Sequence, residues 1–109
     1  MKTIVPILTL ILLNYANTIQ AADATKGEEV FNSNCAGCHA GGKNMIAPGK
    51  SLSKTDLEKN QVNTTPAIIN LVTHGKSPMP GFGKLGVINP TDIENVAAYV
   101  LKQSEADWK

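Results

Sequence analysis

The chain has 109 residues, of which 42% are hydrophobic, and 10 basic residues against 9 acidic ones give a formal net charge of +1. This length allows one domain with a small core, and such domains usually need a covalent link, a metal or a cofactor for stability. The balanced charge argues against nucleic acid as a partner, because binding to a phosphate backbone requires clustered cations.

The first segment is typical of a secretory signal peptide. One cation, Lys2, precedes an apolar run over residues 4–13, and the small-residue segment Gln20-Ala21-Ala22 follows. The run is too short to span a bilayer, and no pair of arginines precedes it, which favours the general secretory route. We therefore expect residues 1–21 to be cleaved, after one of the two alanines. Residues 22–109 then form a single domain without stable membrane insertion.

The pattern of apolar residues after this leader predicts an all-α domain of three or four helices, with no convincing strand. The first helix is expected over residues 25–34, where Thr25 and Glu28 have the spacing of a capping box. Two short helices are expected over residues 53–60 and 65–74. A proline in the first turn and a glycine after the last turn support the second of them.

The last helix has the clearest pattern. It begins at Pro90-Thr91-Asp92, with an acid in the first turn. Its apolar residues recur at helical spacing, at Ile93, Val96, Ala97, Val100 and Leu101. Glycines and prolines break the chain between the helices into loops. Long loops around so small a core suggest that a group other than protein fills the middle of the fold.

The run Cys35-Ala36-Gly37-Cys38-His39 carries the chemistry of this chain. Cys-x-x-Cys-His is the signature of covalent attachment of a c-type haem, in which both thiols add to vinyl groups and the histidine ligates the iron. Two cysteines three residues apart at the end of a helix face the same side. The sequence therefore predicts one haem c, attached through Cys35 and Cys38, with His39 as its first iron ligand.

Three other uses of the cysteine pair are weaker. A redox dithiol would follow a strand of a βαβ unit, and no strand precedes Cys35. A zinc site needs a fourth ligand, for which only His74 is available besides His39. A plain disulfide would leave the core small and His39 without a role.

The second axial ligand decides what the haem does, because a bound thioether closes the iron and raises its potential. Met79 is the predicted ligand, since the flanking prolines in Pro78-Met79-Pro80 hold an extended, rigid loop. Met45 is too close to His39 in sequence to reach the other haem face, and we expect it to pack in the haem pocket. His74, at a helix end, is expected to be a surface residue.

Metal-bound histidines usually donate their other ring N–H to a carbonyl or carboxylate. For His39 the backbone carbonyl of Pro48 is a candidate acceptor. On the sequence alone, a simple turn proline fits Pro48 equally well.

With these features in place, the chain resembles cytochrome c6, the soluble cytochrome c-553 of algae and cyanobacteria. The similar segments cover nearly all of residues 22–109: residues 27–31, 34–42, 79–83, 92–94, 99–101 and 104–105, and Trp108. The resemblance implies an all-α class I cytochrome c fold, with His39 and Met79 as axial ligands and with Pro48 accepting the histidine's hydrogen bond. It also implies photosynthetic electron transport in the thylakoid lumen, from the cytochrome b6-f complex to photosystem I.

Carried over by position, Gly27 and Phe31 would pack against Tyr99 where the first and last helices cross. Two residues depart from the family pattern. Leu71 stands where many members carry a glutamine beside the haem, which alters the local field. Lys84 stands where an arginine often serves in docking, and lysine keeps the charge without the planar fork.

The sequence thus favours a diffusible one-electron carrier, monomeric and not an enzyme. Partners would bind briefly, at a partly apolar patch bordered by lysines 43, 50, 54, 59, 76 and 84. A periplasmic or respiratory carrier that serves an oxidase or dehydrogenase is the nearest alternative. A haem-based sensor or peroxidase with an open iron position is an alternative of another class, and it requires that Met79 does not ligate.

Overall fold

The computed structural model describes residues 21–109. The expected signal peptide, residues 1–21, therefore lies outside the described residues except for its last alanine. None of the helices between residues 21 and 109 combines the length and the apolar character that a bilayer span requires.

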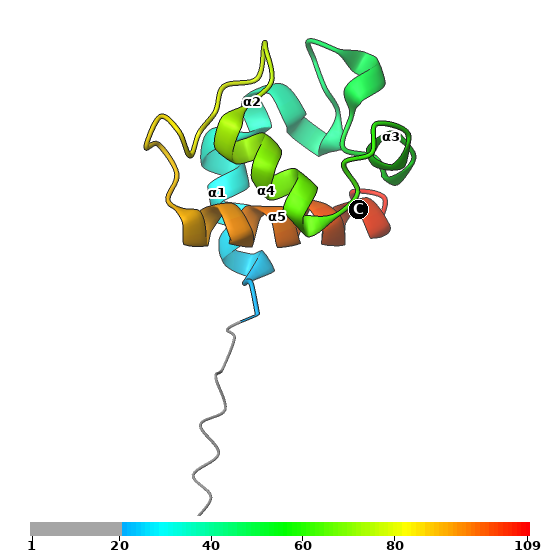
Figure 1. Ribbon diagram of the computed structural model, residues 1–109. Helices are drawn as coiled ribbons and strands as arrows, with labels where there is room; N and C mark the ends of the chain where they lie inside the picture. The colour runs from blue at the N-terminus through cyan, green and yellow to red at the C-terminus, as the bar shows by residue number, and fades with distance from the viewer. Residues whose placement is uncertain (1–20) are drawn as a thin grey trace, which may run out of the picture.

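The described chain is helical, as the sequence predicts (Figure 1). Its helices are α1 (Ala24–Asn34), α2 (Ala36–His39), α3 (Lys54–Lys59), α4 (Thr65–His74) and α5 (Pro90–Glu105), with 3-10 turns η1 (Ala40–Gly42) and η2 (Pro48–Lys50). Within residues 21–109, strand-like pairing is limited to an isolated bridge between Lys76 and Met79. The predicted all-α fold class is confirmed.

Side-chain caps fix where the helices begin. Asn89 accepts a hydrogen bond from the Asp92 N–H at 2.8 Å and starts α5, and Thr64 caps α4 in the same way. Asp23 caps α1, because its Oδ1 accepts from the N–H groups of Thr25 and Lys26. The predicted capping box that begins at Thr25 is therefore wrong. An aspartate two residues earlier already satisfies the first free N–H groups of the helix.

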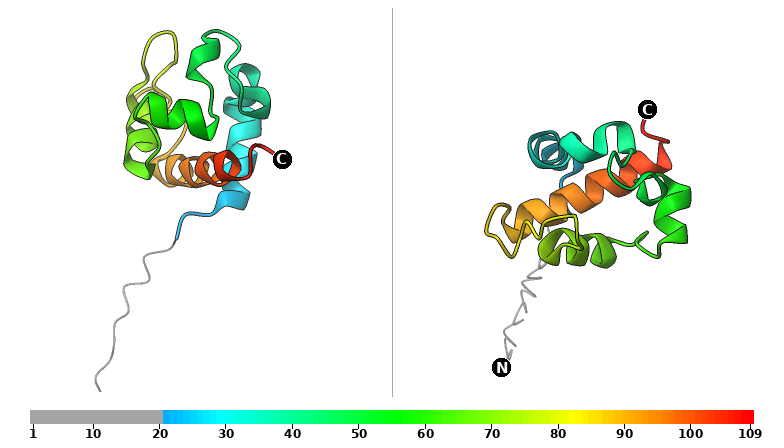
Figure 2. Two further views of the ribbon diagram at one scale, coloured as in Figure 1. Left: turned by 90° about the vertical axis from the view of Figure 1, so that its right-hand side faces the viewer. Right: turned by 90° about the horizontal axis from the view of Figure 1, so that it is seen from above.

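Helices α1 and α5 cross steeply at the centre of the fold (Figures 1 and 2). Gly27 is the point of closest approach, because a Cβ there would overlap the Asn95 carbonyl oxygen and lie 2.8 Å from Tyr99 Cβ. One turn later, the Phe31 ring packs on the Tyr99 ring with 5.2 Å between centroids. The expected packing of Gly27 and Phe31 against Tyr99 is confirmed.

A buried polar side chain supports the same crossing. Asn95 on α5 is 5% exposed, and its Oδ1 accepts the backbone N–H of Asp23 at 2.8 Å. A buried amide without a partner would destabilise the fold, so this bond holds the start of α1 against α5.

The core is formed mainly by α4 and α5, with one residue each from α1, α3 and the segment before α5. It consists of Phe31, Leu57, Ile68, Val72, Ile88, Ile93, Val96, Ala97 and Val100. Ile93, Val96, Ala97 and Val100 form one face of α5, as their helical spacing predicts. This core is small for the length of chain that surrounds it, and several of its members also line a cavity.

The substitution Gly27→Ala tests the crossing. A methyl group there overlaps backbone rather than a flexible side chain, so α1 must shift, and we expect a loss of about 2–3 kcal/mol in the free energy of unfolding. Denaturant titration of the haem-loaded protein measures it. Gly49→Ala is the matched control, because a Cβ at Gly49 meets nothing within 4 Å. Equal stabilities for the two variants would contradict the assignment.

Candidate functional site

The end of α1 brings the Cys-x-x-Cys-His residues onto one turn of chain. The Cys35 N–H still donates to the Phe31 carbonyl at 2.8 Å, which continues the helix past Asn34. The N–H groups of Cys38 and His39 then both donate to the Cys35 carbonyl, at 3.1 and 2.9 Å. This tight turn holds the two thiols and the imidazole together, as the motif requires.

A cavity of about 270 Å³ adjoins this turn. Its lining includes Cys35, Cys38, His39 and Met79, so the predicted attachment and ligand residues meet around one space although Met79 is remote in sequence. The size is close to that of pockets that hold small-molecule cofactors. The walls are mainly apolar: α4 contributes Ile68, Leu71 and Val72, α5 contributes Val96 and Val100, and Phe31, Leu52, Leu57, Val62 and Phe82 complete them.

Both cysteines are free thiols, Cys35 half-buried and Cys38 exposed. Burial, and to a lesser extent the nearby Cys38, raises the pKa of the Cys35 thiol to about 11. A redox dithiol typically has a lowered thiol pKa, so these surroundings do not favour that alternative. Two free thiols on the lining of an apolar cavity suit addition to the vinyl groups of a haem.

The imidazole of His39 is oriented by a neighbour in the chain. Its Nδ1–H donates to the carbonyl oxygen of Lys43, with 2.9 Å between nitrogen and oxygen. A carbonyl can only accept, so Nδ1 carries a proton, and in the neutral ring Nε2 is then the nitrogen with a free lone pair for a metal. Such an outer hydrogen bond fixes the ring and increases its basicity.

Pro48 does not accept this hydrogen bond, and that prediction is wrong. Gly41 and Gly42 have φ of 63° and 78°, values that favour glycine, and they turn the chain back so that the Lys43 carbonyl reaches the histidine. Pro48 is exposed in the η2 turn and does not line the cavity. The sequence signal for Lys43 was the Gly-Gly pair directly after Ala40.

The loop that carries Met79 is held by its own backbone. Lys76 and Met79 exchange hydrogen bonds, from Met79 N–H to Lys76 carbonyl at 2.7 Å and from Lys76 N–H to Met79 carbonyl at 3.1 Å. The loop also packs closely on the end of α4, because a Cβ on Gly75 would lie 2.6 Å from the Met79 carbonyl oxygen. Met79 is therefore half-buried at the end of a tight turn that backbone hydrogen bonds hold, whereas its two prolines predict an extended loop.

Met45 does not pack in the cavity, and this prediction is wrong. Its side chain is 72% exposed, while its backbone N–H donates to the Cys38 carbonyl at 3.0 Å. Because the backbone faces the motif, the side chain points to solvent. His74 is exposed, as expected, and does not line the cavity.

Two further residues differ in their relation to the cavity. Leu71, which replaces the glutamine that many family members carry, lines the cavity. Lys84, which replaces an arginine, is exposed and does not line the cavity.

Sequence reasoning missed Asn44, which lines the cavity and organises the loop beside it. Its Oδ1 accepts from the N–H groups of Ile46 and Ala47, and its Nδ2 donates to the Lys50 carbonyl. An asparagine after a glycine turn is the signal that could have identified it.

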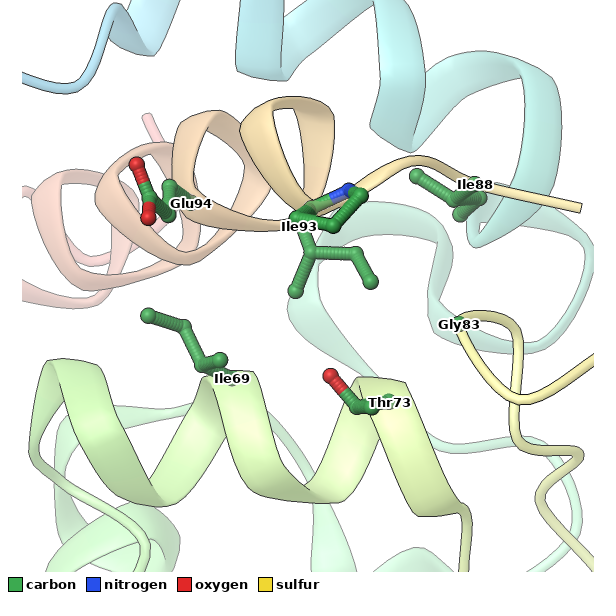
Figure 3. A pocket seen from close by; sticks show the side chains of 7 residues that line it. Ile69, Thr73, Gly83, Ile88, Ile93 and Glu94 are labelled. Carbon is green, nitrogen blue, oxygen red and sulfur yellow. The ribbon is translucent and has the colours of Figure 1, made fainter. Parts of the chain in front are cut away.

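A second hollow, of about 240 Å³, lies on the other side of α4 (Figure 3). It is lined by Ile69, Thr73, Gly83, Ile88, Pro90, Ile93 and Glu94. None of the predicted ligand residues reaches it, so the two faces of α4 have different surroundings.

The residues around the larger cavity fit a covalently bound haem. Free thiols of Cys35 and Cys38 can form thioethers, His39 offers Nε2, and Met79 offers a thioether sulfur on the same lining. Apolar walls are the surroundings that a porphyrin needs. Among residues 21–109, no three His, Cys, Asp or Glu side chains gather as ligands for a metal ion on their own.

Comparisons with known proteins agree with this chemistry. Residues 22–100 match the family model described as cytochrome c oxidase, cbb3-type, subunit III. Cytochrome c6 of Rippkaea orientalis is 48% identical, and the match covers 100% of both chains. Cytochrome c6 of Bumilleriopsis filiformis is 53% identical over 80% of this chain and 99% of its own. The solved structure of cytochrome c6 from the diatom Phaeodactylum tricornutum superimposes with a TM-score of 0.76 at 48% identity, covering 80% of this chain and 100% of that one.

The cysteine pair gives a direct test of covalent attachment. The protein expressed with haem-attachment machinery should keep its haem through acid–acetone extraction, and the variant carrying both Cys35→Ser and Cys38→Ser should lose it, because no thioether can form. Mass spectrometry under denaturing conditions measures the bound group. Cys35→Ser alone is the control and should keep one thioether. Extraction of haem from the wild type would contradict the assignment.

Proposed function

We propose that this chain, which belongs to the cytochrome c6 family, carries single electrons from the cytochrome b6-f complex to photosystem I in the thylakoid lumen. As a member of that family it is an electron-transfer protein rather than an enzyme, and it holds one covalently bound haem c with its iron. Its partners are therefore bound transiently. The particular partners and the lumenal location are our proposal.

One observation carries the proposal for the site. His39 and Met79 line the same cavity as the two free thiols. We assign Cys35 and Cys38 as the thioether attachments, and His39 Nε2 and Met79 Sδ as the axial ligands. The haem supplies an iron that alternates between Fe(II) and Fe(III). If His39 and Met79 both ligated the iron, no bond to it would have to form or break when its oxidation state changes.

The protein's own part is to hold these ligands still. The Lys43 carbonyl fixes the His39 ring, and the reciprocal hydrogen bonds between Lys76 and Met79 fix the methionine loop. Leu71, Val72 and the other apolar lining residues give the cavity walls that would limit the access of water to a bound haem. A thioether ligand in an apolar cavity favours the reduced state.

The exposed residues at the cavity support transient docking of a partner protein. Lys50 and Lys76 belong to its lining and are exposed, and so are the apolar residues Ile46 and Pro78. Of the other expected border lysines, Lys54 pairs with Glu105 at 3.2 Å on the surface. A small apolar patch with a few cations suits an acidic partner that must release quickly.

A respiratory or periplasmic carrier is the second candidate. The observation that favours it is the match of residues 22–100 to a family model described as a subunit of a cbb3-type oxidase. The same site chemistry would serve either role, so only the electron acceptor distinguishes the two. A sensor or peroxidase, in contrast, requires an open iron position.

The axial ligand is tested by comparing two methionines. Met79→Ala should abolish the ferric charge-transfer band of methionine–iron coordination and produce a high-spin component, because the sulfur ligand is lost. Visible spectra of the purified holoprotein measure both. Met45→Ala is the matched control, since that side chain is 72% exposed and does not line the cavity. A high-spin wild-type spectrum would contradict the carrier and favour the open-iron alternative.

The acceptor is tested by flash kinetics. The reduced protein should re-reduce flash-oxidised photosystem I faster than a mitochondrial-type cytochrome c, and Lys76→Glu should slow this reaction roughly several-fold at low ionic strength, with the difference fading as salt screens the charge. Lys102→Glu, a change of an exposed lysine that does not line the cavity, is the control. Equal rates with photosystem I, together with faster oxidation by a cbb3-type oxidase, would overturn the photosynthetic role in favour of the respiratory one.

A further inference from the structure

Trp108 contacts two residues that bound the loop next to the candidate ligand His39, although it is the penultimate residue of the chain. Its indole Nε1–H donates to the Leu52 carbonyl at 2.8 Å, and its backbone N–H donates to the Gln103 carbonyl at 2.8 Å. The side chain does not line the haem cavity. Nothing in the proposed ligand set therefore explains why a tryptophan is anchored there.

The indole ring lies directly on Gly42. A Cβ on Gly42 would overlap ring atoms of Trp108, and this glycine is buried with a φ of 78°. The Leu52 N–H donates to the Gly42 carbonyl at 2.7 Å. Trp108 thus contacts both ends of the 42–52 segment, one through its ring face and the other through its ring nitrogen.

The residue that follows Gly42 is the partner of the histidine. The Lys43 carbonyl accepts the His39 Nδ1–H at 2.9 Å, and the Lys43 N–H donates to the Ala40 carbonyl at 3.2 Å. Because Gly42 and Lys43 share a peptide bond, a shift of Gly42 away from α5 also moves the Lys43 carbonyl. The position of the indole is therefore coupled to the length and angle of the histidine's hydrogen bond.

The rest of the fold holds the indole in place. Its ring centroid lies 5.3 Å from that of Phe31 and 5.9 Å from that of Tyr99, the latter in an edge-on arrangement. Phe31 belongs to α1 and Tyr99 to α5, so the indole rests on the central helix crossing. The indole is therefore packed between the aromatic rings of Phe31 and Tyr99 and the glycine turn at Gly42, an arrangement called here the Trp108 clamp.

We propose that Trp108 is a positioning residue for the axial ligand His39, acting through Gly42 and the Lys43 carbonyl. This inference rests on the proposed role of His39 as an iron ligand. A strong Nδ1–H hydrogen bond makes the imidazole a better electron donor and stabilises Fe(III). Loosening the clamp weakens that bond, so the midpoint potential rises.

The variant Trp108→Phe keeps an aromatic ring and removes the bond to the Leu52 carbonyl. In the reduced holoprotein we expect exchange of the His39 Nδ1 proton with solvent, followed by NMR, to become about tenfold faster after correction for global stability, as the loss of one hydrogen bond implies. The midpoint potential should shift upward in the same variant.

Ile93→Ala is the matched control, because Ile93 is buried at the α4–α5 contact and lines only the second hollow (Figure 3). It should lower global stability while leaving the corrected exchange rate and the potential unchanged. The proposal would be overturned if both variants changed the exchange rate and the potential equally. It would also be overturned if Trp108→Phe changed neither.

If Trp108→Phe does not fold, native-state exchange in the wild type decides the matter. We expect the same opening free energy and the same denaturant dependence for three exchanging protons: the Trp108 Nε1 proton, the Leu52 amide proton and the His39 Nδ1 proton. Different opening free energies would overturn the proposal. The wild-type spectrum distinguishes this outcome from failure of the proposed function, because a low-spin spectrum with the methionine band supports the ligand set whatever the exchange data show.

Discussion

The close contact between α1 and α5 at Gly27 determines the placement of the whole site. Without a side chain at this position, the α1 backbone lies against the Asn95 carbonyl, and the Asp23–Asn95 hydrogen bond holds the start of the helix. The direction of α1 then fixes where its last turn ends. Since Cys35 continues that helix through its bond to the Phe31 carbonyl, the crossing decides where both thiols and His39 lie.

The cavity and the small protein core share many of their residues. Phe31, Leu57, Ile68, Val72, Val96 and Val100 are buried core residues that also line the cavity, so the apolar surface around it is continuous with the core. A domain of this size has a low ratio of buried to exposed surface. A haem held in this cavity would therefore extend the apolar core as well as provide redox chemistry.

The two candidate axial ligands are held by different means. Met79 is fixed locally, by reciprocal backbone hydrogen bonds within its own tight turn. His39 depends on the Lys43 carbonyl, and the path of that loop depends on Gly41, Gly42 and the indole of Trp108. The proposed role of Trp108 therefore links the histidine's hydrogen bond to packing at residue 108, whereas the hydrogen bonds that hold Met79 lie within its own turn.

Features that depend on short-range spacing can be predicted from the sequence alone. The helix periods, the turn that groups Cys35, Cys38 and His39, and the hydrogen-bonded turn of Met79 all arise from neighbouring residues. Features that depend on the path of the loops require the tertiary structure. Positive φ at two glycines lets the Lys43 carbonyl rather than that of Pro48 accept the histidine's hydrogen bond, and the bond from the Met45 N–H to the Cys38 carbonyl leaves the Met45 side chain in solvent. The Gly41-Gly42 pair indicates a turn in the sequence, but the path of that turn also depends on contacts between residues remote in sequence, such as Gly42 and Trp108.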